Sequence, residues 1–374
     1  MNLCRLCIIP DTRPDTEFVD GICSACIAYE KRKSIDWYAR RAQFNELLAR
    51  VKETARSRGN KYDCIVPSSG GKDSHYQVLT VMEHGLRPLV VTASTCHLTL
   101  IGRANIDNLK RFATTVESNN DTHVRARLNH IGLEMVGDIS WPEHVAIFTF
   151  PFRVAKEIGI PFIFYGENPQ NQYGGPLGTQ EAKKMTRRWV SEFGGFNGLR
   201  PQDLIGMDGL TRDGMDFYIL PPGAADGIEA HFLGQYFPWD SHANAKVAES
   251  NGMMQQLPSA ANWWPHENLD NAQTGLHDYM MYRKYGYGRA TAQLSVDVRA
   301  GLLTRTAALD LANRRDGLLP YPYCNVTLES MISKIGFSID QLYEVIDRFT
   351  NWDLFSTSSG TIKIIAQKWA SPSA

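Results

Sequence analysis

Apolar runs alternate with amphipathic stretches across residues 62–165, and this alternation predicts a series of strands and helices. Four short apolar runs predict strands, at residues 62–67, 88–93, 123–128 and 161–165. The stretches between them predict helices, at residues 74–84, 105–118 and 144–158. Strands and helices in regular alternation are typical of an α/β domain with a mostly parallel sheet, which is the fold class we expect.

The flanking segments predict further elements. Residues 35–58 carry apolar side chains at helical spacing, and Gly59-Asn60 favours a helix end there. Residues 228–237 predict a fifth strand of the sheet. Short capped helices are expected at residues 304–315, 327–335 and 338–349. We therefore expect a helical C-terminal region packed on the sheet.

The turn after the first predicted strand is rich in glycine and serine: Ser68, Ser69, Gly70, Gly71, Lys72, Asp73 and Ser74. A strand, a glycine-rich turn and a helix together present backbone N–H groups to an anion. Adjacent glycines let a phosphate approach the main chain because no Cβ stands in the way. Lys72 adds a positive charge, and Asp73 is suited to cap the helix or hold magnesium. A plain glycine-rich turn with a helix cap is the alternative.

This loop lacks the spacing of a Walker A motif. Instead, Ser69 to Ser74 resembles the S-G-G-x-D-S loop of the PP-loop ATP pyrophosphatases. The resemblance implies an enzyme that binds ATP and releases pyrophosphate. It also implies an open, Rossmann-like sheet in which the first and fourth strands are neighbours.

Ligands of such sheets bind beyond the carboxyl ends of the strands. Thr92 and Ser94 follow the second predicted strand, so we expect them to approach the adenine and ribose of ATP. Glu167 and Asn168 follow the fourth strand and are expected opposite the phosphate loop. Glu167 would hold magnesium or act on the reacting group, unless it is an ordinary surface carboxylate. Asn168 would donate a hydrogen bond.

Four of the seven cysteines form two pairs near the N-terminus, Cys4-x-x-Cys7 and Cys23-x-x-Cys26. This spacing is typical of a zinc ribbon, in which each pair supplies two thiolates to one tetrahedral ion. Four cysteine ligands leave no position for water, so the zinc would be structural. A redox pair or an iron–sulfur cluster is the alternative.

Composition narrows the function classes. The formal net charge is −1, with 43% hydrophobic and 21% charged residues, so we expect no nucleic-acid partner. No apolar run approaches membrane-spanning length, and the first residues do not resemble a signal peptide. We therefore expect a cytoplasmic protein that does not bind membranes.

Several blocks further along the chain resemble the N-acetyl sugar amidotransferases of surface-polysaccharide and nonulosonate pathways, including pseudaminic acid biosynthesis. They are Trp141-Pro-Glu-His144, Gly166-Glu-Asn-Pro-Gln170, Tyr173-Gly-Gly175, Tyr236-Phe-Pro-Trp-Asp240, His277-Asp-Tyr279 and Lys284 to Thr291. With the cysteine pairs and the phosphate loop, these blocks span nearly the whole chain. The resemblance extends to the branch that acts on a UDP-linked acetamido sugar in lipopolysaccharide O-antigen assembly. It implies conversion of an N-acetyl group to an acetamidino group with ATP and ammonia.

This chemistry agrees with the residues. An amide oxygen must be activated before it can leave, and adenylation of that oxygen releases pyrophosphate, which a loop such as Ser69 to Ser74 would hold. Lys72, the backbone amides and magnesium would meet the developing negative charge. His144 or Glu143 would accept a proton from ammonia, although each residue type is more often packed or solvated. Tyr173 is a candidate substrate contact, and Arg289 is either a phosphate contact or a structural residue.

The source of ammonia is expected to be another protein. Cys64, Cys96 and Cys324 have no nucleophile-elbow context, and no segment is left over for a glutaminase domain. The family resemblance implies a glutaminase subunit and a cyclase-like subunit that channels ammonia.

We expect a zinc ribbon at residues 1–34, an ATP pyrophosphatase domain at 35–240 and a mainly helical region at 241–374. Two other functions fit the same motifs. A tRNA-thiolating PP-loop enzyme would need a basic surface and further paired cysteines. A non-catalytic zinc-ribbon protein that merely binds nucleotide would not need the intact Lys72 and Asp73.

Overall fold

The computed structural model describes residues 1–13, 15–179, 184–186, 189–190, 194–358 and 361–364. Its centre is a six-stranded sheet in the order β5-β4-β3-β6-β8-β7. The strands are β3 (Cys64–Pro67), β4 (Pro88–Thr92), β5 (Thr115–Glu117), β6 (Phe162–Tyr165), β7 (Lys184–Met185) and β8 (Glu229–Phe232). Only β7 at one edge is antiparallel among these strands. The expected α/β fold with a mostly parallel sheet is confirmed, and β3 and β6 are neighbours as expected.

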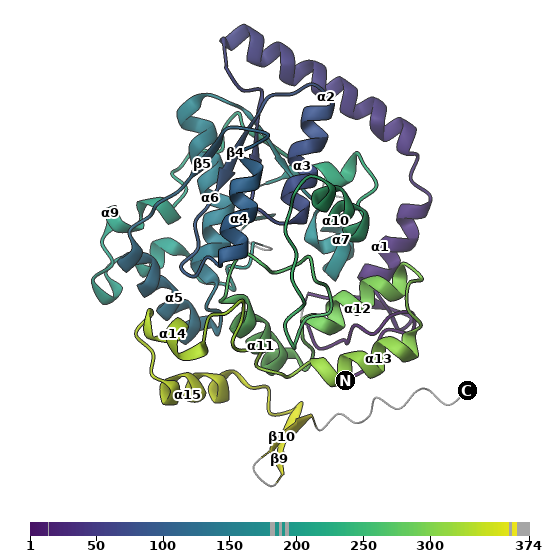
Figure 1. Cartoon of the computed structure of the whole chain (residues 1–374), viewed down its shortest axis with the longest axis vertical. Coiled ribbons are helices and arrows are strands. Elements are labelled where there is room, and N and C mark those ends of the chain that lie inside the picture. The colour runs from purple at the N-terminus through teal and green to yellow at the C-terminus, as the bar shows by residue number, and fades with distance from the viewer. Residues whose placement is uncertain (14, 180–183, 187–188, 191–193, 359–360, 365–374) are drawn as a thin grey trace.

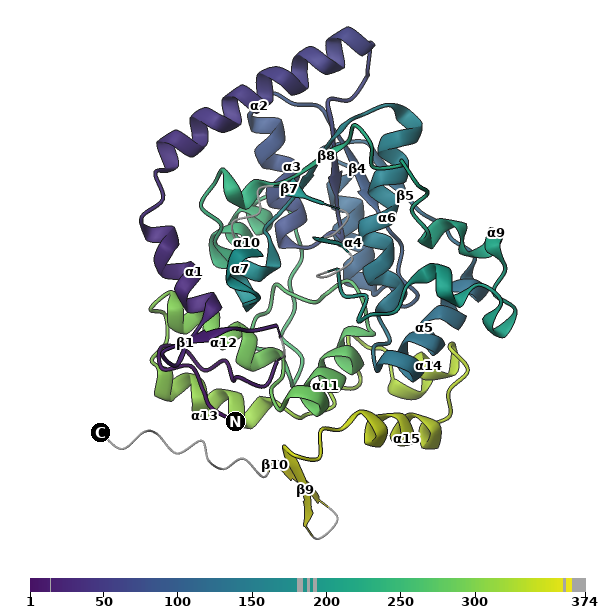
Figure 2. The ribbon, with the colours of Figure 1, turned by 180° about the vertical axis from the view of Figure 1, so that it is seen from behind.

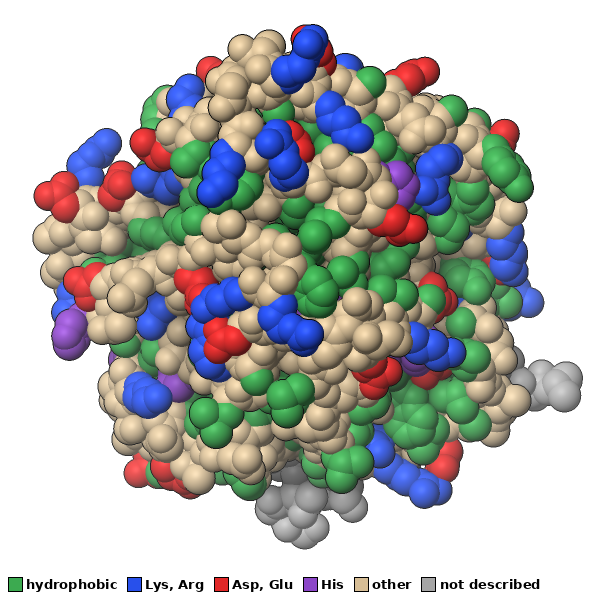
Figure 3. Space-filling model, turned by 45° about the horizontal axis from the view of Figure 1, so that its top comes forward, with side chains coloured by type: hydrophobic (Ala, Val, Ile, Leu, Met, Phe, Trp, Pro, Cys, Tyr) green, Lys and Arg blue, Asp and Glu red, His purple; other side chains and the backbone are tan. Residues whose placement is uncertain are grey.

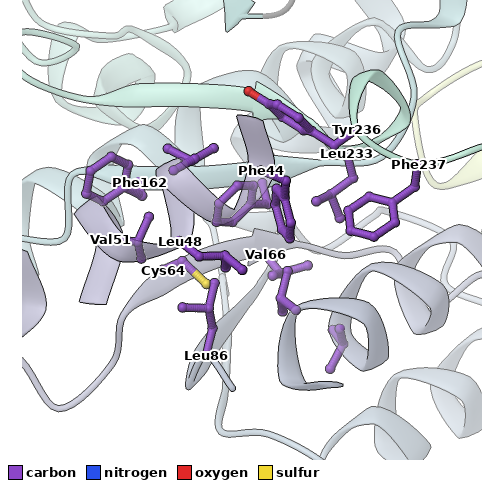
Figure 4. Close-up of a cluster of buried hydrophobic side chains, with 14 of the residues drawn as sticks. Phe44, Leu48, Val51, Cys64, Val66, Leu86, Phe162, Leu233, Tyr236 and Phe237 are labelled. Carbon is purple, nitrogen blue, oxygen red and sulfur yellow. The ribbon is translucent and has the colours of Figure 1, made fainter. Parts of the chain in front are cut away.

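Both faces of the sheet are buried, which explains why its strands β3, β4 and β6 are continuously apolar. On one face Cys64 and Val66 of β3 pack with Phe44 of the long helix α2 (Trp37–Arg58), as Figure 4 shows. On the other face Ile65 packs with Phe152 of α6 (Trp141–Ile158). Alternate residues of a strand point to opposite faces, so the sheet holds a separate core on each side.

Helices lie on both sides of the sheet (Figures 1 and 2). Of these, α3 (Lys72–Glu83) and α4 (Leu100–Leu109) contribute to the core around Phe44. Three further helices are α7 (Pro169–Tyr173), which is short, α10 (Ser241–Ser250), and α5 (Thr122–Val136), which packs with the short α9 (Arg212–Met215) in a separate cluster. The helices α3 and α10 pack along each other. This pairing brings the segment after β8 alongside the segment after β3.

Two expectations from the sequence are wrong. The third strand is not at residues 123–128, which lie in α5 instead. Asp121 caps α5 by accepting hydrogen bonds from the backbone N–H groups of His123 and Val124, at 2.8 and 3.3 Å. The helix expected at residues 105–118 is also misplaced, because α4 covers Leu100–Leu109 and the real third strand, β5, covers residues expected at the end of that helix. It is short and only half buried, so its apolar pattern is weak.

The remaining expected elements agree with the structure to within a few residues. The exception is the fifth strand, which ends at Phe232 and continues as a 3₁₀ turn at Leu233–Gln235.

The N-terminal segment packs against helices from the C-terminal part of the chain. It consists of a small hairpin, β1 (Phe18–Val19) and β2 (Ile22–Cys23), followed by α1 (Ser24–Lys33). This hairpin lies beside α12 (Arg289–Arg299) and α13 (Arg305–Arg315) in both ribbon views (Figures 1 and 2). Arg305 of α13 links the two segments by hydrogen bonds: its Nε donates to the carbonyl oxygens of Cys4 and Cys7, at 3.2 and 2.9 Å.

The rest of the C-terminal region is mainly helical. It contains α11 (Thr274–Tyr285), α14 (Leu328–Ser333) and α15 (Ile339–Phe349), and it also forms an unexpected hairpin of β9 (Phe355–Ser358) and β10 (Thr361–Ile364). Leu276 of α11 and Leu342 of α15 share a core with Leu133 of α5. The region therefore packs on the α/β core.

Acidic and basic side chains are intermingled on the face that Figure 3 shows. This mixture agrees with the net charge of −1. In the described part of the chain, no helix has both the length and the apolar character needed to cross a membrane.

Candidate functional site

The glycine-rich loop lies at the carboxyl end of β3, where it turns into α3. Internal hydrogen bonds shape it: the backbone N–H of Ser69 donates to Ser74 Oγ at 3.1 Å, and that of Gly70 donates to Ser68 Oγ at 3.0 Å. Gly70 has a φ of +83°. A Cβ at this position would lie 2.8 Å from Ile106 Cγ1 and 2.9 Å from its backbone nitrogen. Glycine is therefore required here, both by conformation and by the closeness of α4.

Lys72 is a buried cation held between two carboxylates. Its side chain is 3% exposed, and its Nζ lies 2.9 Å from Asp73 Oδ2 and 2.8 Å from Glu267 Oε1. Burial lowers the pKa of Lys72, but the charges of Asp73 and Glu267 outweigh burial and raise it. Lys72 is therefore a fixed positive charge beside the loop.

Glu267 is a site residue that the sequence did not indicate. Burial raises its pKa, but the charges of Lys72 and Arg289 lower it to about 2. It also accepts hydrogen bonds from Gln293 Nε2 at 2.8 Å and from Tyr173 Oη at 3.4 Å. Glu267 thus connects the loop to α12 and to the expected substrate residue Tyr173.

A cavity of about 170 Å³ opens beside the loop, and we call it the loop cavity. Its walls include Ser69 to Ser74, Tyr173, Glu267, Asp270 and Arg289. Arg289 is the first residue of α12 and pairs with Asp278, with Nη2 2.7 Å from Oδ1. This pair keeps a guanidinium at the cavity wall.

Asp270 differs from the other carboxylates around the loop. It faces the loop cavity, and no cation pairs with it among the described residues. Burial raises its pKa to about 6. A carboxylate of this kind gains most from a bound cation, because the cation offsets the cost of burying its charge.

A second cavity of about 230 Å³, the strand-end cavity, adjoins the first beyond the ends of β4 and β5. Both cavities are lined by Ser69, Asp270 and Arg289. Thr92 and Ser94 lie on the wall, as expected for residues that approach a nucleoside. The hydroxyl of Thr92 is buried and has no hydrogen-bond partner in the described part of the chain, so it is available to a ligand.

The two candidate proton acceptors, Glu143 and His144, line the strand-end cavity. Glu143 accepts hydrogen bonds from Asn129 Nδ2 at 2.7 Å and from the backbone N–H of Cys96 at 3.3 Å. Burial raises its pKa to about 7. His144 Nδ1 lies 3.2 Å from Asp138 Oδ2. Burial lowers the pKa of His144, but the charge of Asp138 raises it above its usual value.

The structure does not bring Glu167 and Asn168 to these two cavities. Glu167 lines a separate cavity of about 270 Å³, where it forms an ion pair with Arg32 of α1. Burial raises its pKa to about 7, so it is not an ordinary surface carboxylate either. Asn168 is buried and caps α7, and its Nδ2 donates to the Thr179 carbonyl oxygen at 2.8 Å. Its amide is therefore used within the fold.

The four N-terminal cysteines are buried, and their Sγ atoms all lie within 4.8 Å of one another. Cys4 and Cys26 are 3.7 Å apart at sulfur, and Cys7 and Cys23 are 3.6 Å apart. Thiolates bound tetrahedrally to one zinc ion are separated by roughly 3.8 Å, so the group could hold zinc. Arg299 of α12 contacts Cys7, with Nη1 3.7 Å from Sγ.

Residues 258–368 match the family model described as "LPS biosynthesis protein WbpG-like, C-terminal domain". No curated protein matches the chain. The matched segment includes Glu267, Asp270 and Arg289, which complete the walls of the loop cavity. The match supports a role in polysaccharide biosynthesis. The matched segment lines the same cavity as the glycine-rich loop.

Proposed function

We propose that the chain is an ATP-dependent amidotransferase that acts on a nucleotide-linked acetamido sugar, with UDP as the nucleotide. It adenylates the N-acetyl oxygen and replaces it with nitrogen from ammonia, which gives an acetamidino sugar, AMP and pyrophosphate. One observation carries the proposal: the glycine-rich loop with its buried Lys72 shares a cavity with residues of the segment matched to LPS biosynthesis proteins.

The two adjoining cavities suit the two parts of ATP. The β- and γ-phosphates would occupy the loop cavity, where the loop amides, Lys72 and Arg289 offer positive charge and N–H groups. The adenosine would lie in the strand-end cavity, with Thr92 and Ser94 on its wall.

Magnesium fits the same place. Asp270 has an oxygen-ligand side chain without a cation partner in the described residues, and Asp73 lies at the same cavity. These two carboxylates would hold the ion, since magnesium in ATP-dependent enzymes binds one or two carboxylates together with phosphates. Bound magnesium would neutralise charge on the phosphates.

The bonds change in two steps. First, the amide oxygen attacks the α-phosphorus of ATP, an O–P bond forms, and the bond to pyrophosphate breaks. Lys72 and the loop amides stabilise the charge that develops on pyrophosphate. Second, ammonia adds to the imidate carbon, and the C–O bond to AMP breaks.

A proton leaves the attacking nitrogen in the second step, and we assign it to Glu143. This carboxyl faces the strand-end cavity and has a pKa of about 7, close to the pH at which a general base works best. Asn129 and the backbone of Cys96 hold it in place.

The test combines pyrophosphate release with mass spectrometry of the products. The purified chain is incubated with ATP, magnesium, ammonium and one candidate UDP-acetamido sugar at a time. We expect pyrophosphate only with the correct sugar, together with a product in which NH has replaced oxygen. Release that requires tRNA and a sulfur donor would identify a thiolating enzyme instead. No release with any substrate would identify a nucleotide-binding protein without this activity.

A further inference from the structure

Two histidines converge on one buried aspartate at the wall of the strand-end cavity. His277 Nδ1 lies 2.8 Å from Asp138 Oδ1, and His144 Nδ1 lies 3.2 Å from Asp138 Oδ2. The two imidazole rings meet edge to face, with centroids 5.2 Å apart. Both histidines line the cavity. The group therefore faces the space in which a ligand would bind.

The three side chains come from separate elements that fix them independently. Asp138 follows the end of α5, and its Oδ1 accepts the backbone N–H of Ser140 at 2.9 Å. His144 lies in the first turns of α6, and His277 lies in the first turn of α11. Side chains placed by rigid elements in this way form a preorganised group.

We propose that Asp138, His144 and His277 bind a divalent transition-metal ion of the zinc class. Two imidazoles and one carboxylate are the protein ligands of many zinc and non-haem iron sites. Ligands bound at about 2.1 Å to one ion lie roughly 3.0–3.4 Å from one another. The separation of 3.2 Å lies in this range, and the hydrogen-bonded separation of 2.8 Å would widen slightly around an ion. The possible ligand atoms of all three residues lie within 4.8 Å of one another.

The Nδ1 atoms of both histidines face the carboxylate that would share the ion. His144 Nδ1 is buried, and it is within ion-pair distance of Asp138 Oδ2, at 3.2 Å, without meeting hydrogen-bond geometry. Metal binding requires neutral imidazoles, so the ion would replace the protons between the histidines and Asp138.

The charges around the group leave room for a cation. Asp138 is buried, and its carboxylate faces both histidines. Lys284 of α11 is engaged elsewhere, because its Nζ donates to the Val136 carbonyl oxygen. Glu143 and Arg289 face the same cavity with opposite charges.

Three protein ligands beside a cavity leave at least one coordination position for a ligand or water, which distinguishes this site from the closed cysteine site. The open position would take an oxygen of the bound substrate, from a hydroxyl, a phosphate or an amide carbonyl. The ion would act there as a Lewis acid. The inference does not depend on the identity of the sugar or on the amidotransferase reaction.

Metal analysis tests the site without any activity measurement. The full chain is stripped with a chelator, reloaded with excess zinc, desalted and measured by mass spectrometry of the element. We expect two zinc ions per chain, one at the cysteines and one here. His277→Ala and Asp138→Asn should each reduce the content to one, while His123→Ala, an exposed histidine on α5, should leave it at two.

Cobalt loading identifies which site holds each ion. Cobalt at the cysteines gives strong thiolate charge-transfer absorption, whereas cobalt bound by two histidines and an aspartate gives only weak visible bands. We expect the weak bands to disappear in His277→Ala and the thiolate bands to persist. The proposal would be overturned if the unmodified chain bound only one metal ion and its cobalt spectrum showed only thiolate bands. This outcome does not depend on whether the variants fold.

Discussion

Lys72 combines a structural role with its proposed role in catalysis. Its ammonium group is almost completely buried and contacts two carboxylates. Asp73 is its neighbour in sequence, whereas Glu267 lies 195 residues further along the chain. Removing one partner of such a group leaves an uncompensated buried charge, which costs about 3–5 kcal/mol. A simple substitution of Lys72 would therefore reduce both activity and stability.

A pair of variants separates these two effects. We expect Lys72→Met to lose pyrophosphate release by roughly 10²–10³-fold, the size found when a charge-stabilising donor is removed. It should also unfold at lower denaturant concentration, because Glu267 loses its cation. The double variant Lys72→Met/Glu267→Gln should recover most of the stability and none of the activity. Recovery of activity in the double variant would remove Lys72 from the mechanism.

The raised pKa of Glu143 predicts how the reaction rate depends on pH. Its pKa is raised to about 7, so it is protonated below this pH and cannot accept a proton from ammonia. We expect kcat/KM at saturating ATP, expressed per unit of free NH₃, to rise with pH up to about 7 and then level off. Glu143→Gln should abolish this limb and lower the rate by about 10²–10⁴-fold. Glu157→Gln, an exposed position on the same helix, should keep the wild-type profile.

The site could be predicted from the sequence only where its residues are adjacent in the chain. The loop from Ser68 to Ser74 has a recognisable spacing, and Thr92 and Ser94 follow from strand geometry. Glu267 and Asp270 lie in a segment without regular structure, where nothing local separates them from surface carboxylates. Glu167 shows the converse, since its place after a strand was correct but Arg32 of α1 holds it in another cavity.

At the scale of elements, the turn between β3 and α3 depends on one glycine more than on the other. Gly70 has positive φ, and an added Cβ would meet the backbone of α4, whereas Gly71 has a φ of −75° and its Cβ would contact only Ser69 Oγ at 3.5 Å. An L-residue in the left-handed region costs ~1–2 kcal/mol, and overpacking adds about 1–3 kcal/mol.

We therefore expect Gly70→Ala to lower the melting temperature clearly and Gly71→Ala to leave it nearly unchanged. Differential scanning calorimetry of both variants measures this difference. ATP should also stabilise Gly70→Ala less than wild type, because the displaced loop no longer presents its amides. Equal melting temperatures for the two variants would contradict the loop geometry described above.

The elements themselves could be predicted where they are long or fully buried. The strands β3, β4 and β6 are continuously apolar, and they appear within two residues of the expected positions. The third strand was missed because β5 has three residues and contributes no fully buried side chain. Its neighbour α5 carries Arg125 and Asn129 in buried positions, which weakens the helical pattern in sequence.

At the scale of the whole molecule, the site is assembled from distant parts of the chain. The matched C-terminal segment supplies Glu267 and Asp270 to a cavity whose other wall follows β3. The N-terminal cysteine group touches the same C-terminal helices through Arg299 and Arg305. The expected boundaries at residues 34 and 240 therefore separate segments that pack closely together.

The cysteines of the whole chain bear on where the ammonia comes from. A glutaminase needs an activated cysteine thiolate. Outside the N-terminal group, burial raises the pKa of each remaining thiol, Cys64, Cys96 and Cys324, which is the opposite of activation. We therefore propose, as the family resemblance implies, that a separate glutaminase and an ammonia-channelling subunit are the partners.

We expect the isolated chain to release pyrophosphate with ammonium and to be inactive with glutamine alone. Raising the pH should lower the ammonium concentration that is required, because the reactive species is neutral ammonia. Adding a glutaminase with its cyclase-like subunit should restore activity with glutamine and leave activity with ammonium unchanged. The Cys64→Ala, Cys96→Ala and Cys324→Ala variants should behave like wild type with ammonium. Glutamine-dependent turnover by the chain alone, lost in any one of these three variants, would instead place the glutaminase within this chain.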